Sequence, residues 1–139
     1  MRLDTDEART RLLESRVARL ATVSLAGEPH MVPITFALVG DGLFFVVDHK
    51  PKNTMDLRRL RNIRENDRVS VLADHYSDDW DTLWWVRADG NAEVWEDGPR
   101  RAAAVDVLAQ KYPQYREHVP RGPVVAITIV ALTGWSFTG

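Results

Sequence analysis

The chain has 139 residues, 45% of them hydrophobic, so it is long enough to form one domain with a substantial core. It contains no cysteine, which excludes a disulfide framework, and no apolar run of the ~20 residues that span a membrane; the opening MRLDTDEARTRLLESR is too charged for a signal peptide. We therefore expect a cytoplasmic protein without a membrane partner, and the net charge of −2 argues against a nucleic-acid partner.

The first third of the chain reads as one helix followed by three strands. Asp4 or Thr5 can cap the helix, and acidic side chains occupy its first turn. The predicted strands cover residues 17–24, 28–39 and 43–49. Between the last two, Gly40-Asp41-Gly42 is typical of the tight turn of a β-hairpin.

The remaining elements alternate between helices and strands. A helix is predicted from Met55 to Glu65, with Asn53 or Thr54 as its N-cap, and a second begins at Gly98-Pro99. Strands are predicted over residues 68–76, 82–96, with a bulge at Gly90, and 124–137. Six strands with three helices between them predict a single α+β domain, residues 1–139, built on an antiparallel barrel.

One short segment, HKPKNTMDLRRLRN, concentrates positive charge. It holds five basic side chains, Lys50, Lys52, Arg58, Arg59 and Arg61. A locally positive element on a negative protein favours one particular anion over a long polyanion. The free N–H groups and the dipole at a helix start also suit a phosphate group. The alternative is an ordinary basic helix face in contact with water, which charge alone does not rule out.

Familiar catalytic motifs are absent from the sequence. There is no G-x-S-x-G elbow, no Walker loop and no G-x-G-x-x-G, and the spacing of the four histidines matches no helical metal motif. We therefore expect no metal site and interpret the histidines as structural or surface residues. If the protein is an enzyme, a cofactor carries the chemistry.

Four of the five tryptophans, Trp80, Trp84, Trp85 and Trp95, lie close together in the sequence. Trp84 and Trp85 are adjacent, so in a strand their side chains point to opposite faces. One can fill the barrel while the other leaves it. An outward tryptophan on a long strand suggests a subunit interface or a ring stacked on a flat ligand.

The order of these elements resembles a known family. The similarity covers nearly the whole chain and rests on RLATVSLAGEPHMVPITF, FFVVDHKPK, LRRLRNIRENDRVSVLADHY, DDWDTLWWVRADGNAEV and the final TGW. These segments resemble the pyridoxamine 5'-phosphate oxidase-like proteins, which bind FMN or coenzyme F420, and look most like the F420-dependent branch. The resemblance implies a six-stranded antiparallel split β-barrel of Greek-key type with flanking helices, and a homodimer with the cofactor between protomers.

The resemblance also implies where the cofactor binds. Arg58 and Arg59 match the family's phosphate-binding basic pair, and Lys52, with Lys50 beside it, would be a further ligand of the phosphate or tail. The strand segment Val32, Pro33, Ile34 and Thr35 would support the ring system. Trp80 would wall the ring, and Trp85 falls near a cofactor-contacting position of the next strand.

Two features of the sequence bear on which cofactor binds: an arginine that is missing from the second strand and the abundance of basic residues. The arginine that the flavin-oxidase branch carries three residues after the proline of the second strand is absent, since His30, Met31 and Val32 follow Pro29. F420 carries a phosphodiester and a polyglutamate tail, which suits five cations. The 15 arginines against 3 lysines indicate a GC-rich genome, in agreement with an actinobacterial source, where F420 is common.

The resemblance therefore implies an oxidoreductase that transfers a hydride from reduced F420 to an electron-poor small-molecule substrate. No side chain need act as an essential acid or base. One alternative is an FMN-dependent reductase or oxidase of the same fold. The other is a non-catalytic protein that binds a cofactor or haem, for which His30, His49 and His75 are available.

Overall fold

Seven antiparallel strands form one twisted sheet in the computed structural model, which describes residues 1–47 and 57–138. The strands are β1 (Ala18–Val23), β2 (Pro29–Ile34), β3 (Ala37–Val39), β4 (Gly42–Val46), β5 (Arg68–His75), β6 (Trp84–Trp95) and β7 (Val124–Ser136). Their order is β2-β1-β5-β6-β7-β4-β3, and the sheet does not close on itself. The predicted α+β split barrel is confirmed, with seven strands in place of six.

The helices flank the sheet, and three of them overlap the predicted ones. They are α1 (Thr5–Glu14), α2 (Arg58–Glu65), α3 (Pro99–Lys111) and the short α4 (Gln114–Glu117), with one 3-10 turn, η1 (Trp80–Thr82). The backbone N–H of Glu7 donates to the Asp4 carboxylate, which confirms Asp4 as the cap of α1. Among the described residues, no helix combines the length and the apolar character that crossing a membrane requires.

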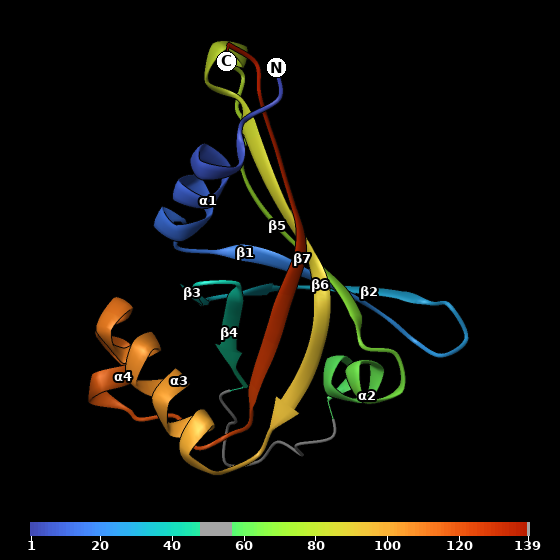
Figure 1. Ribbon diagram of the computed structural model, residues 1–139, viewed down its shortest axis with the longest axis vertical. Helices are drawn as coiled ribbons and strands as arrows, with labels where there is room; N and C mark the ends of the chain where they lie inside the picture. Colours follow the sequence, from blue (N-terminus) through green and yellow to red (C-terminus); the bar gives the residue numbers. More distant parts are fainter. Residues whose placement is uncertain (48–56, 139) are drawn as a thin grey trace.

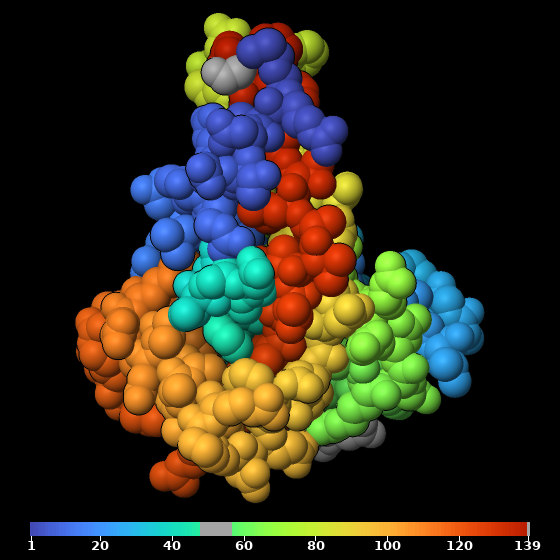
Figure 2. Space-filling model, viewed as in Figure 1, coloured from blue at the N-terminus to red at the C-terminus, as the bar shows by residue number. Residues whose placement is uncertain are grey.

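The molecule has a narrow tip and a broad base (Figure 1). The long strands β5, β6 and β7 run up to the tip, where η1 lies beside both chain termini. The helices α2, α3 and α4 lie around the base, and the strands β1 and β2 cross between tip and base. Figure 2 shows the same taper in the space-filling view, with the tip projecting well beyond the body.

Alternating side chains explain how the sheet forms its core. In β5, Val69, Val71 and Ala73 are buried while the residues between them are partly exposed. The same period of two places Val86 and Ala88 of β6 in the core. The main cluster is closed by helix residues, including Leu12 of α1 and Leu60 and Ile63 of α2.

The predicted bulge at Gly90 is confirmed, because the register of β6 against β7 shifts between Asp89 and Gly90. A Cβ atom at position 90 would lie 2.2 Å from the Thr128 carbonyl oxygen, so only glycine permits this close approach of the two strands.

Two predicted boundaries were wrong. The helix predicted from Met55 begins at Arg58, because Leu57 has extended backbone angles and precedes the first helical turn. The predicted caps Asn53 and Thr54 lie outside the described residues. The strand predicted over 28–39 is two strands, β2 and β3, because the chain turns a corner at Thr35 and Phe36.

The hydroxyl of Tyr112, which is far from Phe36 in the sequence, stabilises this corner between β2 and β3. The buried hydroxyl of Tyr112 accepts a hydrogen bond from the Phe36 N–H at 3.1 Å and lies 3.0 Å from the Phe36 carbonyl oxygen and 2.9 Å from that of Arg16. Tyr112 therefore replaces a strand neighbour as the partner of the Phe36 backbone. The adjacent Thr35 hydroxyl bonds to the Tyr115 hydroxyl at 2.8 Å.

The Tyr112→Phe variant is expected to lose about 2 kcal/mol of unfolding free energy, because the buried Phe36 N–H keeps no partner. The Tyr115→Phe variant is the matched control and should lose less, since Tyr115 is only half-buried and bonds to one side-chain hydroxyl. Urea unfolding of both variants measures the difference. Equal losses would mean that the Tyr112 hydroxyl has no special role at the corner.

Candidate functional site

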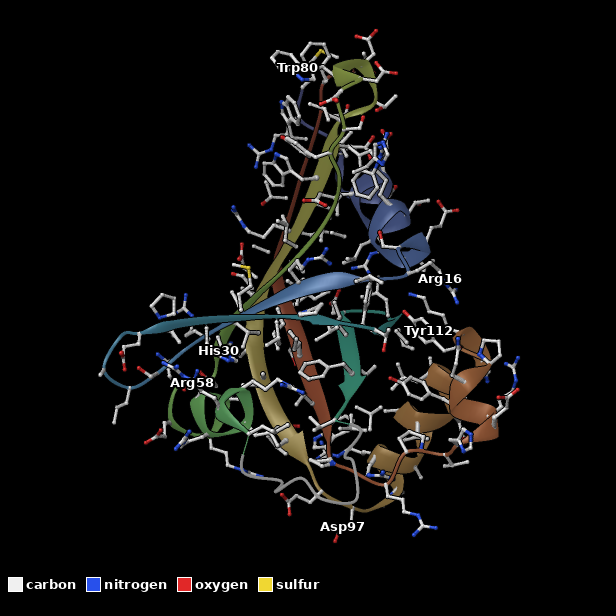
Figure 3. All side chains as sticks on the ribbon, turned by 180° about the vertical axis from the view of Figure 1, so that it is seen from behind. Arg16, His30, Arg58, Trp80, Asp97 and Tyr112 are labelled. Atoms are coloured by element: carbon white, nitrogen blue, oxygen red, sulfur yellow. The ribbon has the colours of Figure 1, made fainter. Side chains whose placement is uncertain are left out.

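Three basic side chains meet where the edge strand β2 passes α2. Figure 3 shows His30 of β2 and Arg58 at the start of α2 close together at this junction. His30 lies opposite Thr22 of β1 in the hairpin, and the charges of both Arg58 and Arg59 act on its imidazole ring. The structure therefore adds His30 to the two arginines that the sequence predicted.

The helix that carries the arginines is held firmly on the barrel. Leu60 and Ile63 are buried in the core. On the same side, the Asn62 amide is buried and donates to the Thr22 hydroxyl at 3.0 Å. Because Thr22 lies opposite His30 in the β1–β2 pairing, this bond fixes the position of α2 relative to His30.

Two nitrogen atoms of this cluster have no partner. The Nδ1 atom of His30 and the Nε atom of Arg59 are both shielded from solvent, and neither has a hydrogen-bond partner among the described residues. A shielded polar atom without a partner costs free energy, on the order of 1–3 kcal/mol. An anion bound between the two side chains would supply acceptors for both nitrogens.

The charges of the cluster agree with this interpretation. Burial lowers the pKa of the Arg59 guanidinium, and burial followed by the charges of Arg58 and Arg59 lowers the pKa of His30. Each shift reflects a cationic form that the surroundings do not stabilise. A bound anion would offset this penalty at both side chains.

The other cations on α2 are more weakly placed. Arg58 lies 3.9 Å from the Glu28 carboxylate, and both side chains are well exposed, so this pair contributes little. Arg64 forms an exposed ion pair with Glu96 at 2.7 Å, and Arg61 is exposed. Lys50 and Lys52, which the sequence also predicted as ligands, lie outside the described residues.

The segment predicted to support a cofactor ring is split between two faces of β2. Val32 packs against the core and Ile34 lies within it, so the side chain of Ile34 is not available to a ligand. Pro33 points outward and is exposed. The strand is at the edge of the sheet, where a proline is tolerated, and Thr35 follows at the corner held by Tyr115.

The predicted aromatic contacts lie elsewhere in the same chain. Trp80 is 65% exposed at the tip, where its ring meets Phe137 at 6.5 Å between centroids. Figure 3 shows it at the opposite end of the molecule from His30 and Arg58. Within one chain, the structure therefore does not bring Trp80 together with the arginine cluster.

Trp84 and Trp85 lie on opposite faces of β6, as predicted. Trp84 packs against the core and beneath the guanidinium of Arg11, which is 5.2 Å from its ring centroid. Trp85 lies on the outer face beside Arg87 and lines a hollow of about 290 Å³ together with Leu72, Asp74 and Tyr76. The outer tryptophan is thus available to a ligand or to another chain.

A larger groove lies on the same outer face of the sheet. It has a volume of about 660 Å³ and is lined by residues of β1, β5, β6 and β7, together with Pro29 of β2. Val130 at its edge is 71% exposed, and Met31 of the neighbouring strand is 68% exposed. Within residues 1–47 and 57–138, no three histidine or acidic side chains are grouped as a metal ion would require.

The sequence profile described as "Pyridoxamine 5'-phosphate oxidase" matches residues 4–136. The chain belongs to this family. The predicted resemblance to pyridoxamine 5'-phosphate oxidase-like proteins is therefore confirmed. The 5a,11a-dehydrotetracycline/5a,11a-dehydrooxytetracycline reductase of Streptomyces rimosus is 34% identical over 70 residues. That match covers 50% of this chain and 48% of the reductase, so the chain spans about half the length of this curated relative.

Solved structures share the fold of the pyridoxamine 5'-phosphate oxidase family member described here. A conserved hypothetical protein from Mycobacterium tuberculosis has a TM-score of 0.78 and 21% identity, covering 96% of this chain and 85% of that protein. A FAD-binding protein from Mesorhizobium loti has a TM-score of 0.72 and 24% identity, covering 96% of this chain and 95% of that protein. The heme storage protein HutZ of Vibrio cholerae has a TM-score of 0.74 and 18% identity, covering all of both chains. At these identities the likeness shows the fold alone.

Sequence reasoning missed His30, which it interpreted as a structural or surface residue. The signal that could have found it is the alternation of β2. His30 shares a face with Val32 and Ile34, and this face turns toward the core and toward α2. An inward-facing histidine beside a pair of arginines points to an anion site more than to a surface role.

Proposed function

We propose that this protein is a coenzyme F420-dependent oxidoreductase that acts on an electron-poor small molecule. The observation that carries the proposal is the pair of shielded nitrogens on His30 and Arg59, which have no hydrogen-bond partner in the described part of the chain, on a barrel of this family. When bound, F420 supplies the hydride. The described residues fit its phosphodiester, because they offer two guanidinium groups and an imidazole at one junction.

In this proposal, the chain binds and orients the cofactor. Arg58 and Arg59 hold the phosphodiester through charge-assisted hydrogen bonds, with Lys50 and Lys52 as further cations for the phosphate or the tail. The exposed Pro33 and the backbone of Val32 to Thr35 support the ring at the sheet edge. The protein contributes orientation and exclusion of water, and none of these side chains needs to gain or lose a proton with the substrate.

Two observations support a reductase that uses F420. The Streptomyces rimosus relative is named a reductase, which favours the same class of reaction here. Val32 stands three residues after Pro29, where the flavin-oxidase branch carries an arginine, and the basic segment holds more cations than a single phosphate requires. The FAD-binding protein of Mesorhizobium loti keeps an FMN-dependent reductase or oxidase as the second candidate.

The positions of Trp80 and the arginines favour a homodimer with shared sites. The tip segment from Asp74 to Asp81 contains four aspartates and no lysine or arginine, whereas the segment from Arg58 to Arg68 contains five arginines and two acidic residues. A two-fold axis would bring each acidic tip to the basic base of the other protomer, where opposite charges attract. Trp80 of the partner subunit would then pack against the ring of the cofactor that Arg58 and Arg59 hold.

Titration of the purified protein with F420 and with FMN tests the proposed cofactor. We expect F420 to bind with a dissociation constant well below about 100 μM, a value that corresponds to only about 5.5 kcal/mol. Weaker binding than this would refute the proposal. Tighter binding of FMN than of F420 would favour the flavin candidate, and a haem absorption band without turnover would favour a binding protein.

A further inference from the structure

We propose that His30 is a proton-coupled ligand of the bound anion, so that its imidazole takes up a proton when the anion binds and the affinity rises as the pH falls. The inference rests on the proposed cofactor site at Arg58 and Arg59 and concerns how that site is regulated. It gives His30 a role that the two arginines cannot fill, because they stay charged throughout the physiological pH range.

The geometry places the ring in contact with the site. His30 lies on the inner face of β2 opposite Thr22, and Asn62 of α2 binds Thr22 at 3.0 Å. Its Nδ1 atom is shielded from solvent and has no hydrogen-bond partner among the described residues. Arg59 leaves its Nε atom in the same condition. One acceptor group between the two side chains would satisfy both atoms.

Among residues 1–47 and 57–138, the groups that face His30 are cationic or neutral. From α2 they are Arg58, Arg59 and the neutral Asn62, and from β1 the neutral Thr22. The nearby Glu28 carboxylate is paired with Arg58 at 3.9 Å and is well exposed. Without an anion, burial and the two guanidinium charges lower the pKa of His30, so the neutral ring is favoured at neutral pH.

A bound anion favours the charged imidazole ring over the neutral one. Its negative charge compensates the two guanidinium groups, and it accepts a hydrogen bond from Nδ1–H. A neutral ring with its proton on Nδ1 can also donate, but the charged ring donates more strongly. The pKa of His30 is therefore higher in the complex than in the free protein. Affinity rises as the pH falls through the pKa of the complex and levels off below the pKa of the free protein.

Sulfate is a suitable probe, because its charge is constant over the range in which imidazole titrates. The measurement is the NMR titration of the His30 ring in the natural chain, in sodium sulfate and in sodium chloride at equal ionic strength, so that general screening is subtracted. The exposed ring of His118, at the end of α4 and outside the tip segment proposed to meet the partner subunit, is the internal reference. The same titration is then repeated with F420.

We expect sulfate and F420 each to raise the pKa of His30 by about one unit over chloride, which corresponds to a tenfold gain in affinity between the two limiting pH values. The Arg64→Gln variant should show the same shift, and the Arg59→Gln variant a smaller one. In the His30→Asn variant, the sulfate affinity should lose its dependence on pH over this range.

The outcomes separate this inference from the proposed cofactor. If F420 binds while the His30 titration stays as in chloride, the cofactor proposal stands and the proton coupling is refuted. If F420 does not bind but sulfate shifts His30, the proton-coupled anion site stands and the F420 assignment fails. If neither probe shifts His30, or if the His118 signal moves as much as that of His30, the inference is refuted.

Discussion

The Arg59→Gln variant is expected to bind F420 about 10- to 100-fold more weakly than the natural chain, whereas the Arg64→Gln variant should stay within about twofold. Arg59 is half-buried, and its shielded Nε atom has no partner within residues 1–47 and 57–138, so a bound phosphate gains a strong, charge-assisted hydrogen bond there. Arg64 is exposed and already paired with Glu96 at 2.7 Å.

The measurement is a fluorescence titration of F420 with each purified variant at low and high salt. The two substitutions remove the same charge from the same helix, so general attraction of an anion would weaken equally in both. Circular dichroism and urea unfolding show whether each variant keeps its fold. Equal effects of Arg59→Gln and Arg64→Gln would restore the interpretation of the basic segment as an ordinary solvated helix face.

Mixing two variants that bind F420 weakly is expected to restore tight binding at some F420 sites. Trp80→Ala and Arg59→Gln should each weaken every site in their own homodimers. If each site takes Arg59 from one protomer and Trp80 from the partner subunit, a mixed dimer contains one site with both changes and one site with neither. Random exchange should therefore give tight binding at about a quarter of all sites.

The mixed dimers are made by producing both variants together, and a titration of the mixture counts the tight sites. Each variant measured alone is the control and should show no tight phase. If Trp80 and Arg59 served the same site from one chain, mixing would restore nothing, because every chain carries one of the two changes. A monomer in size-exclusion chromatography would refute the shared site directly.

Local sequence patterns predicted most of the fold, because alternation and turn residues act over short distances. The hairpin at Gly40 and Asp41 and the bulge at Gly90 both depend on neighbours within a few residues or on one strand partner. The division of β2 from β3 was not predictable in this way. It depends on Tyr112, which is 76 residues from Phe36 in the sequence, and no local pattern contains that contact.

The candidate site was likewise predictable in part, and the rest depends on contacts between residues far apart in the sequence. The family resemblance pointed to Arg58 and Arg59, and the structure places both beside His30, with Arg59 half-buried and Arg58 exposed. His30 was missed because its significance arises only when the β1–β2 hairpin and α2 pack together through Thr22 and Asn62. The assignment of Ile34 to the ring ignored the alternation of its own strand, which places that side chain in the core.

The corner held by Tyr112 has a consequence for engineering new specificity. Tyr112 and Tyr115 connect the end of α3 and the start of α4 to Phe36 and Thr35, at the end of the strand proposed to carry the cofactor ring. A loop transplanted from a relative beyond Tyr115 leaves this connection intact. One that replaces the two tyrosines also removes the support of the cofactor strand, so a failed transplant of that kind would say nothing about substrate preference.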